Sequence, residues 1–262
     1  MTTRAERRTP VMTWLAVVAT GLLVLPLVAL LLRTPWTRMP DLLAEPNVLA
    51  ALWLSLVCSL GALALSTMLG VPLAWVFARR EFPAKTLVRA LCVLPMVLPP
   101  VVGGVALLLA FGRRGVLGQP VDQITGLTLP FSTAGVILAE TFVAMPFLVV
   151  TVEAGLRAMD RRYEDAAATL GARRWLTFRR VTVPLIAPSL GAGMALCWAR
   201  ALGEFGATIT FAGNLPGRTQ TMPLAVYLLL ETDSEAAILL SLLLLAVSVV
   251  VLVALRGRLL TS

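Results

Sequence analysis

The ionisable side chains that could do chemistry in this chain are few, and two of them, Arg200 and Glu204, stand four residues apart within an apolar segment. On a helix this spacing places both side chains on one face, so a guanidinium–carboxylate ion pair is the simplest arrangement. The alternative is that Arg200 contacts a passing anion. Glu140, in a second apolar segment, could join the pair. These residues predict charge pairing or anion contact, and they offer no acid–base constellation for catalysis.

Other kinds of chemistry lack the residues they need. The chain has no histidine, which argues against a histidine-based catalytic triad and against a zinc site. It has no GxxxxGK[ST] loop, the common nucleotide-binding sequence. Cys58, Cys92 and Cys197 lie far apart inside apolar segments, where cysteine is typical of packing. We therefore expect no catalytic residue, no metal ligand and no cofactor site in this chain.

The composition is that of a protein built to lie in a membrane. Hydrophobic residues make up 58% and charged residues 14% of the 262 residues, whereas globular domains are roughly half apolar and a quarter charged. The apolar segments have the length of membrane-spanning helices. The sequence thus predicts an all-α polytopic membrane protein with one transmembrane domain over residues 1–262. The six expected spans are residues 11–32, 48–78, 90–111, 134–156, 185–212 and 236–255.

The basic residues are divided unevenly between the two sides of these spans. If the N-terminus is cytoplasmic, 16 of the 22 basic residues lie in inner segments and five lie in outer ones, with Arg200 left in the membrane. Because cytoplasmic loops carry the excess of arginine and lysine, this division predicts that both termini are cytoplasmic. The net charge of +8 then reflects topology and contact with membrane lipids, and it does not indicate a nucleic-acid partner.

The longest inner segment, about residues 157–182, has the pattern of two short helices. Asp160 is a candidate N-cap, a run of helix formers follows, and Gly171 can take the left-handed conformation that ends a helix. A second helix would begin near Arg173. Such an amphipathic element could rest on the inner leaflet of the membrane. Its alanines bury little area in lipid but let another backbone come close, so a docking surface for a protein is the preferred interpretation.

Prolines interrupt the third expected span at Pro95, Pro99 and Pro100, and Gly103 and Gly104 follow. Since proline removes a helical hydrogen bond, we expect this segment to be bent or locally unwound, with backbone that can face a cavity. A bend of this kind suits a gate along a pathway. A bend that serves only helix packing is the alternative, and the sequence does not decide between them.

The inner segment also resembles a known motif, the Glu-Ala-Ala loop of the permease subunits of bacterial ABC importers. The residues concerned are Glu164, Asp165, Ala166, Ala167, Gly171 and Pro184. In that family the loop is the coupling helix, which fits a cleft on the ATPase subunit. Asp165 stands in place of the first glutamate of the motif, and Glu164 beside it leaves open which of the two is the acidic partner. The resemblance implies the permease fold of this family.

Four further segments look like the molybdate branch of these permeases, which is close to the sulfate branch. They are Leu94–Pro100, Ala139–Phe147, Arg200–Thr208 and Gly217–Tyr227. The resemblance implies a homodimer that works with two ATPase subunits, which bind ATP and Mg, and with an extracytoplasmic oxyanion-binding protein. The implied function is import of a tetrahedral oxyanion across the cell membrane. Molybdate is the preferred substrate, and sulfate and tungstate are the alternatives.

Two functions of other classes remain as rivals. A self-sufficient secondary transporter would need a coupling-ion site and usually an internal repeat, and neither is evident in the sequence. A membrane enzyme would need a polar constellation for acid–base or metal chemistry. Uptake by the purified chain without an ATPase would support the first rival, and turnover of a substrate by the isolated chain would support the second.

Overall fold

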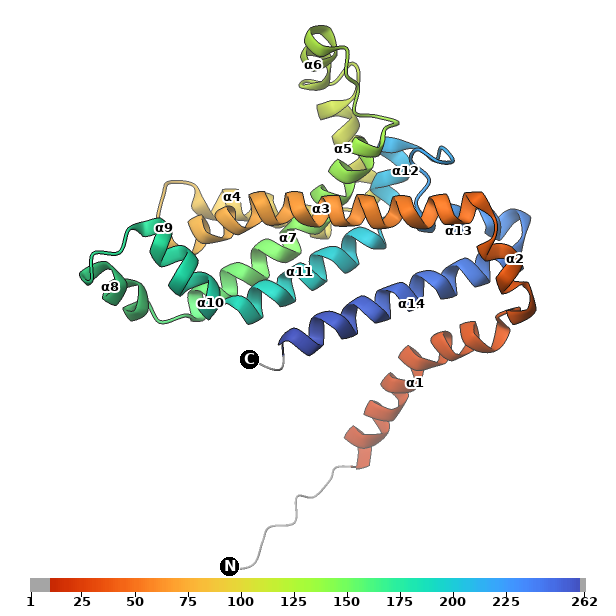
Figure 1. Cartoon of the computed structure of the whole chain (residues 1–262), viewed down its shortest axis with the longest axis horizontal. Helices are drawn as coiled ribbons and strands as arrows, with labels where there is room; N and C mark the ends of the chain where they lie inside the picture. Colours follow the sequence, from red (N-terminus) through yellow and green to blue (C-terminus); the bar gives the residue numbers. More distant parts are fainter. Residues whose placement is uncertain (1–9, 260–262) are drawn as a thin grey trace, which may run out of the picture.

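The structure, a computed structural model, describes residues 10–259, and every regular element in that range is a helix (Figure 1). The long helices are α1 (Pro10–Arg33), α3 (Pro46–Arg79), α7 (Thr133–Ala158), α11 (Ala187–Leu202) and α14 (Ser234–Leu259). The short ones are η1 (Trp36–Arg38), α2 (Met39–Leu43), α4 (Lys85–Val97), α5 (Pro100–Phe111), α6 (Gly118–Thr125), α8 (Arg162–Thr169), α9 (Arg174–Thr177), the π-turn η2 (Phe178–Thr182), α10 (Val183–Leu185), α12 (Gly206–Ala212) and α13 (Met222–Thr232). The predicted all-α class is confirmed. Arg4, Arg7 and Arg8, which contribute to the predicted orientation, lie outside the described residues.

Helices α3, α7 and α11 lie side by side and form the main core (Figure 1). Phe77, Leu148 and Leu156 are fully buried between them. The helices also cross closely: a Cβ atom at Gly155 of α7 would lie 2.4 Å from the Cβ atom of Ser189 in α11, so this crossing requires glycine. The core therefore joins three helices that are far apart in the sequence.

The N-terminal helix α1 lies apart from this core (Figure 1). Its large hydrophobic side chains are exposed along its length, Leu22 and Leu23 among them. The helix is 24 residues long and has no charged residue before Arg33. An apolar helix of this length, exposed on all sides, suits contact with lipid or with another membrane chain.

By length and composition, α1, α3 and α7 qualify as membrane spans, and the bent pair 174–185 and 187–202 would add one more. The two halves of this pair meet at an angle of 76°. Helix α14 covers the sixth expected segment, and α1, α3 and α7 cover the first, second and fourth. The count of six spans stays a prediction, because the third expected segment is divided between two helices and the fifth among three.

The third expected span, residues 90–111, is not one continuous helix. Helix α4 ends at Val97, Leu98 and Pro99 are extended, and α5 begins at Pro100. The cause is the proline pair, since proline lacks an N–H and also pushes the residue before it out of the helical conformation. Pro95 stays within α4. In Figure 1, α5 stands across the direction of α3.

The fifth expected span, residues 185–212, is also divided. Helix α11 begins at Ala187, after a break at Ile186, and ends at Leu202. Helix α12 begins at Gly206. Between them, the carboxylate of Glu204 accepts a hydrogen bond from the backbone N–H of Ala207 at 2.7 Å. A buried side chain that binds a free N–H at a helix start favours a new helix over continuation of the previous one.

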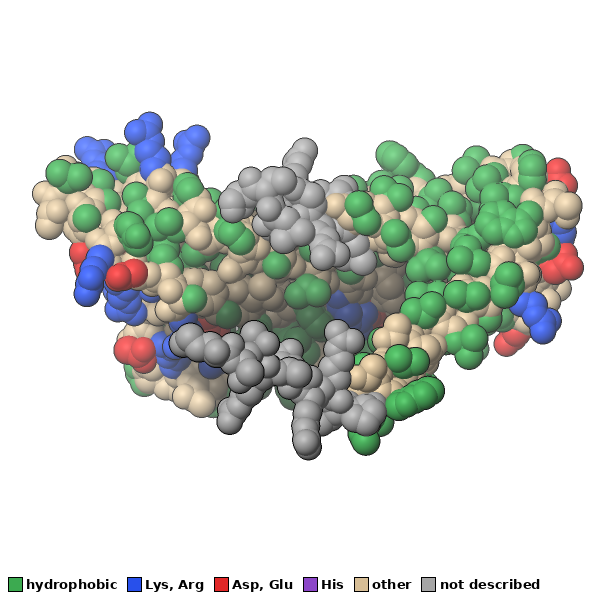
Figure 2. All heavy atoms as spheres, turned by 90° about the horizontal axis from the view of Figure 1, so that it is seen from below, with side chains coloured by type: hydrophobic (Ala, Val, Ile, Leu, Met, Phe, Trp, Pro, Cys, Tyr) green, Lys and Arg blue, Asp and Glu red, His purple; other side chains and the backbone are tan. Residues whose placement is uncertain are grey.

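The two ends of the bundle differ in charge. Arginine gathers at one end, called here the basic end, where the side chains are Arg79, Arg80, Arg89, Arg157 and Arg161. Figure 2 shows Lys and Arg side chains grouped toward the left, the end at which α8 and α9 lie in Figure 1. At the other end, Arg38 of η1 pairs with Asp233 at 2.9 Å and with Glu235 at 2.8 Å, which ties η1 to the junction of α13 and α14.

Candidate functional site

The inner segment predicted to hold two short helices forms a helical hairpin over residues 160–185. Asp160 Oδ1 accepts a hydrogen bond from the backbone N–H of Arg162 at 3.0 Å, at the start of α8. After α8, Gly171 has a φ of +77°, a left-handed conformation that glycine adopts without strain. Helices α9 and α10 and the π-turn between them complete the return. The predicted pair of short helices and the turn at Gly171 are present, but the N-cap of α8 is Arg161 and not Asp160. The role of the hairpin in docking an ATPase stays a prediction.

Helix α8 turns a face of small apolar side chains away from the bundle. Ala166 is exposed, Leu170 is 88% exposed, and Ala167 is half-buried. Pro184, in α10, is also exposed. Alanines on an open helix face let a second protein's backbone approach closely. The arrangement is suited to docking into a cleft.

Of the two acidic residues at the start of α8, Glu164 is the one that fixes the hairpin. Its Oε1 accepts a hydrogen bond from Thr182 Oγ1 at 2.8 Å, and its Oε2 lies 3.1 Å from Arg79 Nε at the end of α3. Asp165 is exposed and forms no ion pair among the described residues. The sequence left the acidic partner open between these two, and the contacts assign the structural role to Glu164.

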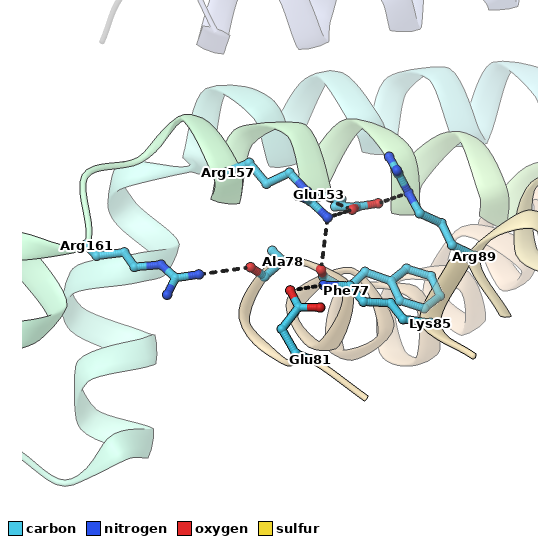
Figure 3. Close-up of polar contacts among 8 residues, drawn as sticks. All are labelled: Phe77, Ala78, Glu81, Lys85, Arg89, Glu153, Arg157 and Arg161. Atoms are coloured by element: carbon cyan, nitrogen blue, oxygen red, sulfur yellow. Dashed lines mark hydrogen bonds and ion pairs between the residues drawn. The ribbon is translucent and has the colours of Figure 1, made fainter. Parts of the chain in front are cut away.

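A second network lies at the basic end, around Glu153 of α7 (Figure 3). The side chain of Glu153 is only 1% exposed; its Oε2 lies 3.0 Å from Arg89 Nε, and its Oε1 lies 2.7 Å from Arg157 Nη2. Arg157 Nη2 also donates to the carbonyl oxygen of Phe77 at 3.2 Å. One buried carboxylate thus connects α4 to α7, and its partner Arg157 connects α7 to α3. We call these three charged residues the Glu153 cluster.

Neighbouring contacts complete this end of the bundle (Figure 3). Arg161 Nη2 donates to the carbonyl oxygen of Ala78 at 3.3 Å. Lys85 Nζ donates to Glu81 Oε1 at 2.8 Å, and this hydrogen bond lowers the pKa of the exposed Glu81 carboxyl. Two backbone carbonyl groups near the end of α3 therefore accept hydrogen bonds from arginines: Arg157 in the last turn of α7, and Arg161 after that helix.

Sequence reasoning missed the Glu153 cluster. The four-residue spacing of Glu153 and Arg157 was a signal for one of its ion pairs. Arg89 lies 64 residues before Glu153, so its contact depends on how α4 packs against α7. No local pattern reports that packing.

In the predicted pathway, Arg200 and Glu204 form the expected ion pair. Arg200 Nη1 lies 2.6 Å from Glu204 Oε2, the Arg200 side chain is 27% exposed, and that of Glu204 is 1% exposed. Glu140 is buried and forms no ion pair among the described residues, and its Oε2 has no hydrogen-bond partner there. Glu140 therefore does not join the ion pair of Arg200 and Glu204.

The two interrupted segments meet each other. A Cβ atom at Gly206 would lie 2.8 Å from the Cβ atom of Pro100, and one at Gly104 would lie 2.6 Å from that of Thr210. Helices α5 and α12 therefore pack backbone to backbone. The proline break at Pro99 and Pro100 and the break at Glu204 are thus brought together, although about a hundred residues separate them in the sequence. Broken helices that meet inside a membrane protein are typical of transport pathways.

Comparison with known proteins identifies the family to which the chain belongs. Residues 66–260 match the family model described as "Binding-protein-dependent transport system inner membrane component". The chain is 46% identical to the molybdenum transport system permease protein ModB of Mycobacterium tuberculosis, over 89% of this chain and 88% of that protein. It is 44% identical to ModB of Escherichia coli K12, over 73% and 83%. It is 37% identical to the sulfate transport system permease protein CysT of Salmonella typhimurium, over 88% and 84%.

Solved structures show the same fold. A bacterial ABC transporter for import of the acidic polysaccharide alginate matches with a TM-score of 0.73 and 17% identity, over 97% of this chain and 94% of that one. The alginate transporter in complex with its pentasaccharide-bound periplasmic protein matches with a TM-score of 0.75 and 16% identity, over 94% and 92%. The family match spans most of the chain and includes the hairpin, both helix breaks and the Glu153 carboxylate. The chain belongs to the family of inner membrane components of binding-protein-dependent transport systems.

Proposed function

We propose that the chain is the membrane permease subunit of an ATP-driven importer that carries molybdate into the cytoplasm. The observation that supports this most directly is its similarity to molybdenum permeases over most of its length. Sulfate and tungstate are tetrahedral oxyanions of the same charge, and a sulfate permease is also among the relatives of the chain. The chain is a multi-pass protein of the plasma membrane, and as a permease it has no catalytic site of its own.

The partners in this proposal are two ATPase subunits, a second copy of the chain and an extracytoplasmic oxyanion-binding protein. ATP and Mg bind to the ATPase subunits. Each ATPase docks on the face of α8 that carries Ala166, with Leu170 directly after the helix, because this surface is apolar and exposed and its alanines let another backbone come close. The hairpin then lies in the cytoplasm, as the distribution of arginine and lysine favours. The binding protein docks at the opposite end of the bundle.

Movement of the hairpin passes to the spans through two polar connections. Glu164 ties the hairpin to Arg79 at the end of α3. The Glu153 cluster then ties α3, α7 and α4 to one another. Since these contacts are short and partly buried, a shift of the hairpin on ATP binding moves the basic ends of several helices together. In this way the transport pathway between the spans changes from facing inward to facing outward.

The passage for the oxyanion lies beside the two helix breaks. Arg200 supplies a positive charge there, and Glu204 neutralises it at 2.6 Å. A neutralised arginine attracts an anion weakly, so the passage does not retain the substrate. Tight selection of molybdate then rests on the external binding protein.

Reconstitution of the chain with its ATPase and binding protein in liposomes tests the proposal. We expect molybdate uptake that requires ATP and both partners, with excess sulfate competing poorly. Uptake by the chain without the ATPase would contradict the proposal and support a secondary transporter. Equal competition by sulfate would leave an oxyanion importer but reject molybdate as the specific substrate.

A further inference from the structure

A cavity lies at the basic end between the last turns of α3 and the hairpin. Its volume is about 610 Å³, within the range of roughly 300–1,000 Å³ typical of small-molecule sites. Pro72, Trp75 and Val76 line it from α3, and Trp175 and Phe178 line it from α9 and the π-turn. Neither the Glu153 cluster nor the pathway residues Arg200 and Glu204 contribute to its lining.

Arg79 indicates what kind of ligand suits this cavity. The Arg79 side chain is only 7% exposed and lines the cavity. Its Nε lies 3.1 Å from Glu164 Oε2 in an ion pair, but neither Nε nor the buried Nη2 has a hydrogen-bond partner among the described residues. A buried guanidinium N–H without an acceptor is costly. A ligand that carries a hydrogen-bond acceptor would therefore satisfy Arg79.

The charges around the cavity favour an anionic acceptor. Arg80 and Arg174 line it together with Arg79, against the two carboxylates of Glu164 and Asp165. Glu164 is already engaged with Arg79 and Thr182. A positive charge is thus in excess, and arginine side chains bind phosphate oxygens with charge-assisted hydrogen bonds.

The rest of the lining favours a ligand that is also apolar. Pro72 precedes Arg79 by seven residues, so the cavity extends about 10 Å along α3 from the charged end into the apolar segment. Trp75 and Trp175 both line the cavity, and Trp175 stacks on Phe178 with ring centroids 5.8 Å apart. Tryptophan is enriched where the hydrocarbon core of a membrane meets the headgroups.

We propose that this cavity binds an anionic phospholipid, with its phosphate against Arg79 and its upper acyl chain between Trp75 and Trp175. The proposal rests on the proposed function for its orientation, because anionic lipids are concentrated in the cytoplasmic leaflet. The lipid contacts both α3 and the hairpin that carries the docking face. It therefore braces the element through which the ATPase acts, and import depends on anionic lipid.

The test is lipid binding by the purified full chain, measured by native mass spectrometry without an ATPase or a substrate. Phosphatidylglycerol and phosphatidylcholine with the same acyl chains are offered separately, and a third sample receives phosphatidylcholine with inorganic phosphate. We expect phosphatidylglycerol to bind about tenfold more tightly than phosphatidylcholine, because both lipids carry the phosphate but the arginines of the lining repel the choline cation of phosphatidylcholine. Equal binding of the two lipids would overturn the proposal, and binding of inorganic phosphate alone with no lipid preference would assign the cavity to a free anion.

Matched variants locate the site. Arg174→Gln, at an exposed residue of the lining, should abolish most of the preference for phosphatidylglycerol, as should Arg79→Gln. Arg173→Gln removes the same charge one residue away from the lining and should leave the preference unchanged. Equal effects of Arg173→Gln and Arg174→Gln would reduce the preference to general surface charge and reject the site. Because no transport is measured, failure of molybdate uptake leaves this result standing, and normal uptake with no lipid preference rejects the lipid site alone.

Discussion

Glu204 Oε2 lies 2.6 Å from Arg200 Nη1, while Oε1 of the same carboxylate accepts the backbone N–H of Ala207 at 2.7 Å. One buried carboxylate thus neutralises the charge of Arg200 in the last turn of α11 and accepts a hydrogen bond from the first turn of α12. Its negative charge also suits the N-terminal end of α12. The ion pair with Arg200 and the hydrogen bond from Ala207 can be removed separately by substitution.

We expect Arg200→Met to lower the free energy of unfolding by about 3 kcal/mol, because it leaves a buried carboxylate without its cation. Adding Glu204→Gln should recover most of this loss, since the glutamine oxygen is uncharged and can still accept from Ala207 N. Adding Glu204→Leu should recover less, because the cap is lost. Thermal stability in detergent, measured on the single and double variants, tests this order.

Transport by the same variants separates structure from substrate contact. If the pair is structural, the stable Arg200→Met/Glu204→Gln protein keeps molybdate uptake. If Arg200 contacts the passing oxyanion, that protein folds but loses uptake. An Arg200→Met protein that is stable and fully active would contradict both roles.

The parts of this site that the sequence predicts are those with local causes. Asp160 and Gly171 act at the two ends of α8 through a hydrogen bond and a backbone conformation that involve only near neighbours. Arg200 and Glu204 form the ion pair that their spacing predicts, but they do not share a helix face, because Glu204 lies in the break after α11. The division of the third span follows from Pro99 and Pro100. Pro95 was also expected to interrupt the helix, but it lies within α4.

The parts that the sequence does not predict depend on how helices pack. Glu153 meets Arg89 only because α4 lies against α7 in one register. Glu164 rather than Asp165 faces Arg79 because of the rotation of α8 about its axis. The contact of Pro100 with Gly206 likewise needs two broken segments to be placed in space. No pattern within a single stretch of sequence predicts such contacts.

The Glu153 cluster predicts unequal roles for two neighbouring cations of α4. Arg89→Gln removes a partner from a carboxylate that is 1% exposed, so it should lower thermal stability clearly and weaken uptake by loosening α4 from α7. Lys85→Gln is the control, because Lys85 pairs with Glu81, whose side chain is 91% exposed, and such pairs contribute little. Melting temperature and uptake measured on both variants check this. Equal losses from the two would contradict the assignment of Glu153 as the connecting residue.

The ion pair of Arg38 and Asp233 predicts a dependence on pH at the opposite end. The hydrogen bond from Arg38 lowers the pKa of the Asp233 carboxyl below its ordinary value. The pair therefore stabilises the folded chain above the unfolded pKa of aspartate, about 4, and this contribution is lost as pH falls through the lower folded pKa. Both side chains are more than a third exposed, so the effect is small and weakens with salt.

The measurement is the melting temperature of wild type and Arg38→Gln between pH 7 and pH 3. The wild type should melt at a higher temperature at pH 7, and the difference should shrink as the carboxyl becomes protonated. A difference that stays constant down to pH 3 would show that Arg38 acts through packing and not through Asp233.

The docking face of α8 predicts that Ala166→Arg abolishes copurification of the ATPase while leaving the fold intact. Ala166 is exposed, so the larger side chain has room in the free chain but obstructs a close-fitting cleft. Ala158→Arg is the matched control, because it adds the same side chain at an exposed position at the end of α7, before the hairpin. Normal copurification with Ala166→Arg would remove α8 as the docking helix.

The orientation of the chain follows from the 16 basic residues expected inside against five outside. Single cysteines are introduced on a background in which Cys58, Cys92 and Cys197 are replaced by alanine. A membrane-impermeant thiol reagent added to intact cells should label Gln123→Cys and Arg218→Cys, which lie at exposed positions in the expected outer segments. Gly217 is avoided because its φ of +70° disfavours other side chains.

Arg162→Cys and Arg173→Cys, both exposed in the hairpin, should be labelled only after the membrane is opened. This result is expected because the proposed docking of an ATPase requires the hairpin to lie in the cytoplasm, where ATP is available. Labelling after lysis is the control for all four positions, since it shows that each cysteine is reactive. The reverse pattern, with the hairpin reached from outside intact cells, would contradict the orientation, the docking of an ATPase on α8 and the proposal that an anionic lipid of the cytoplasmic leaflet binds beside Arg79.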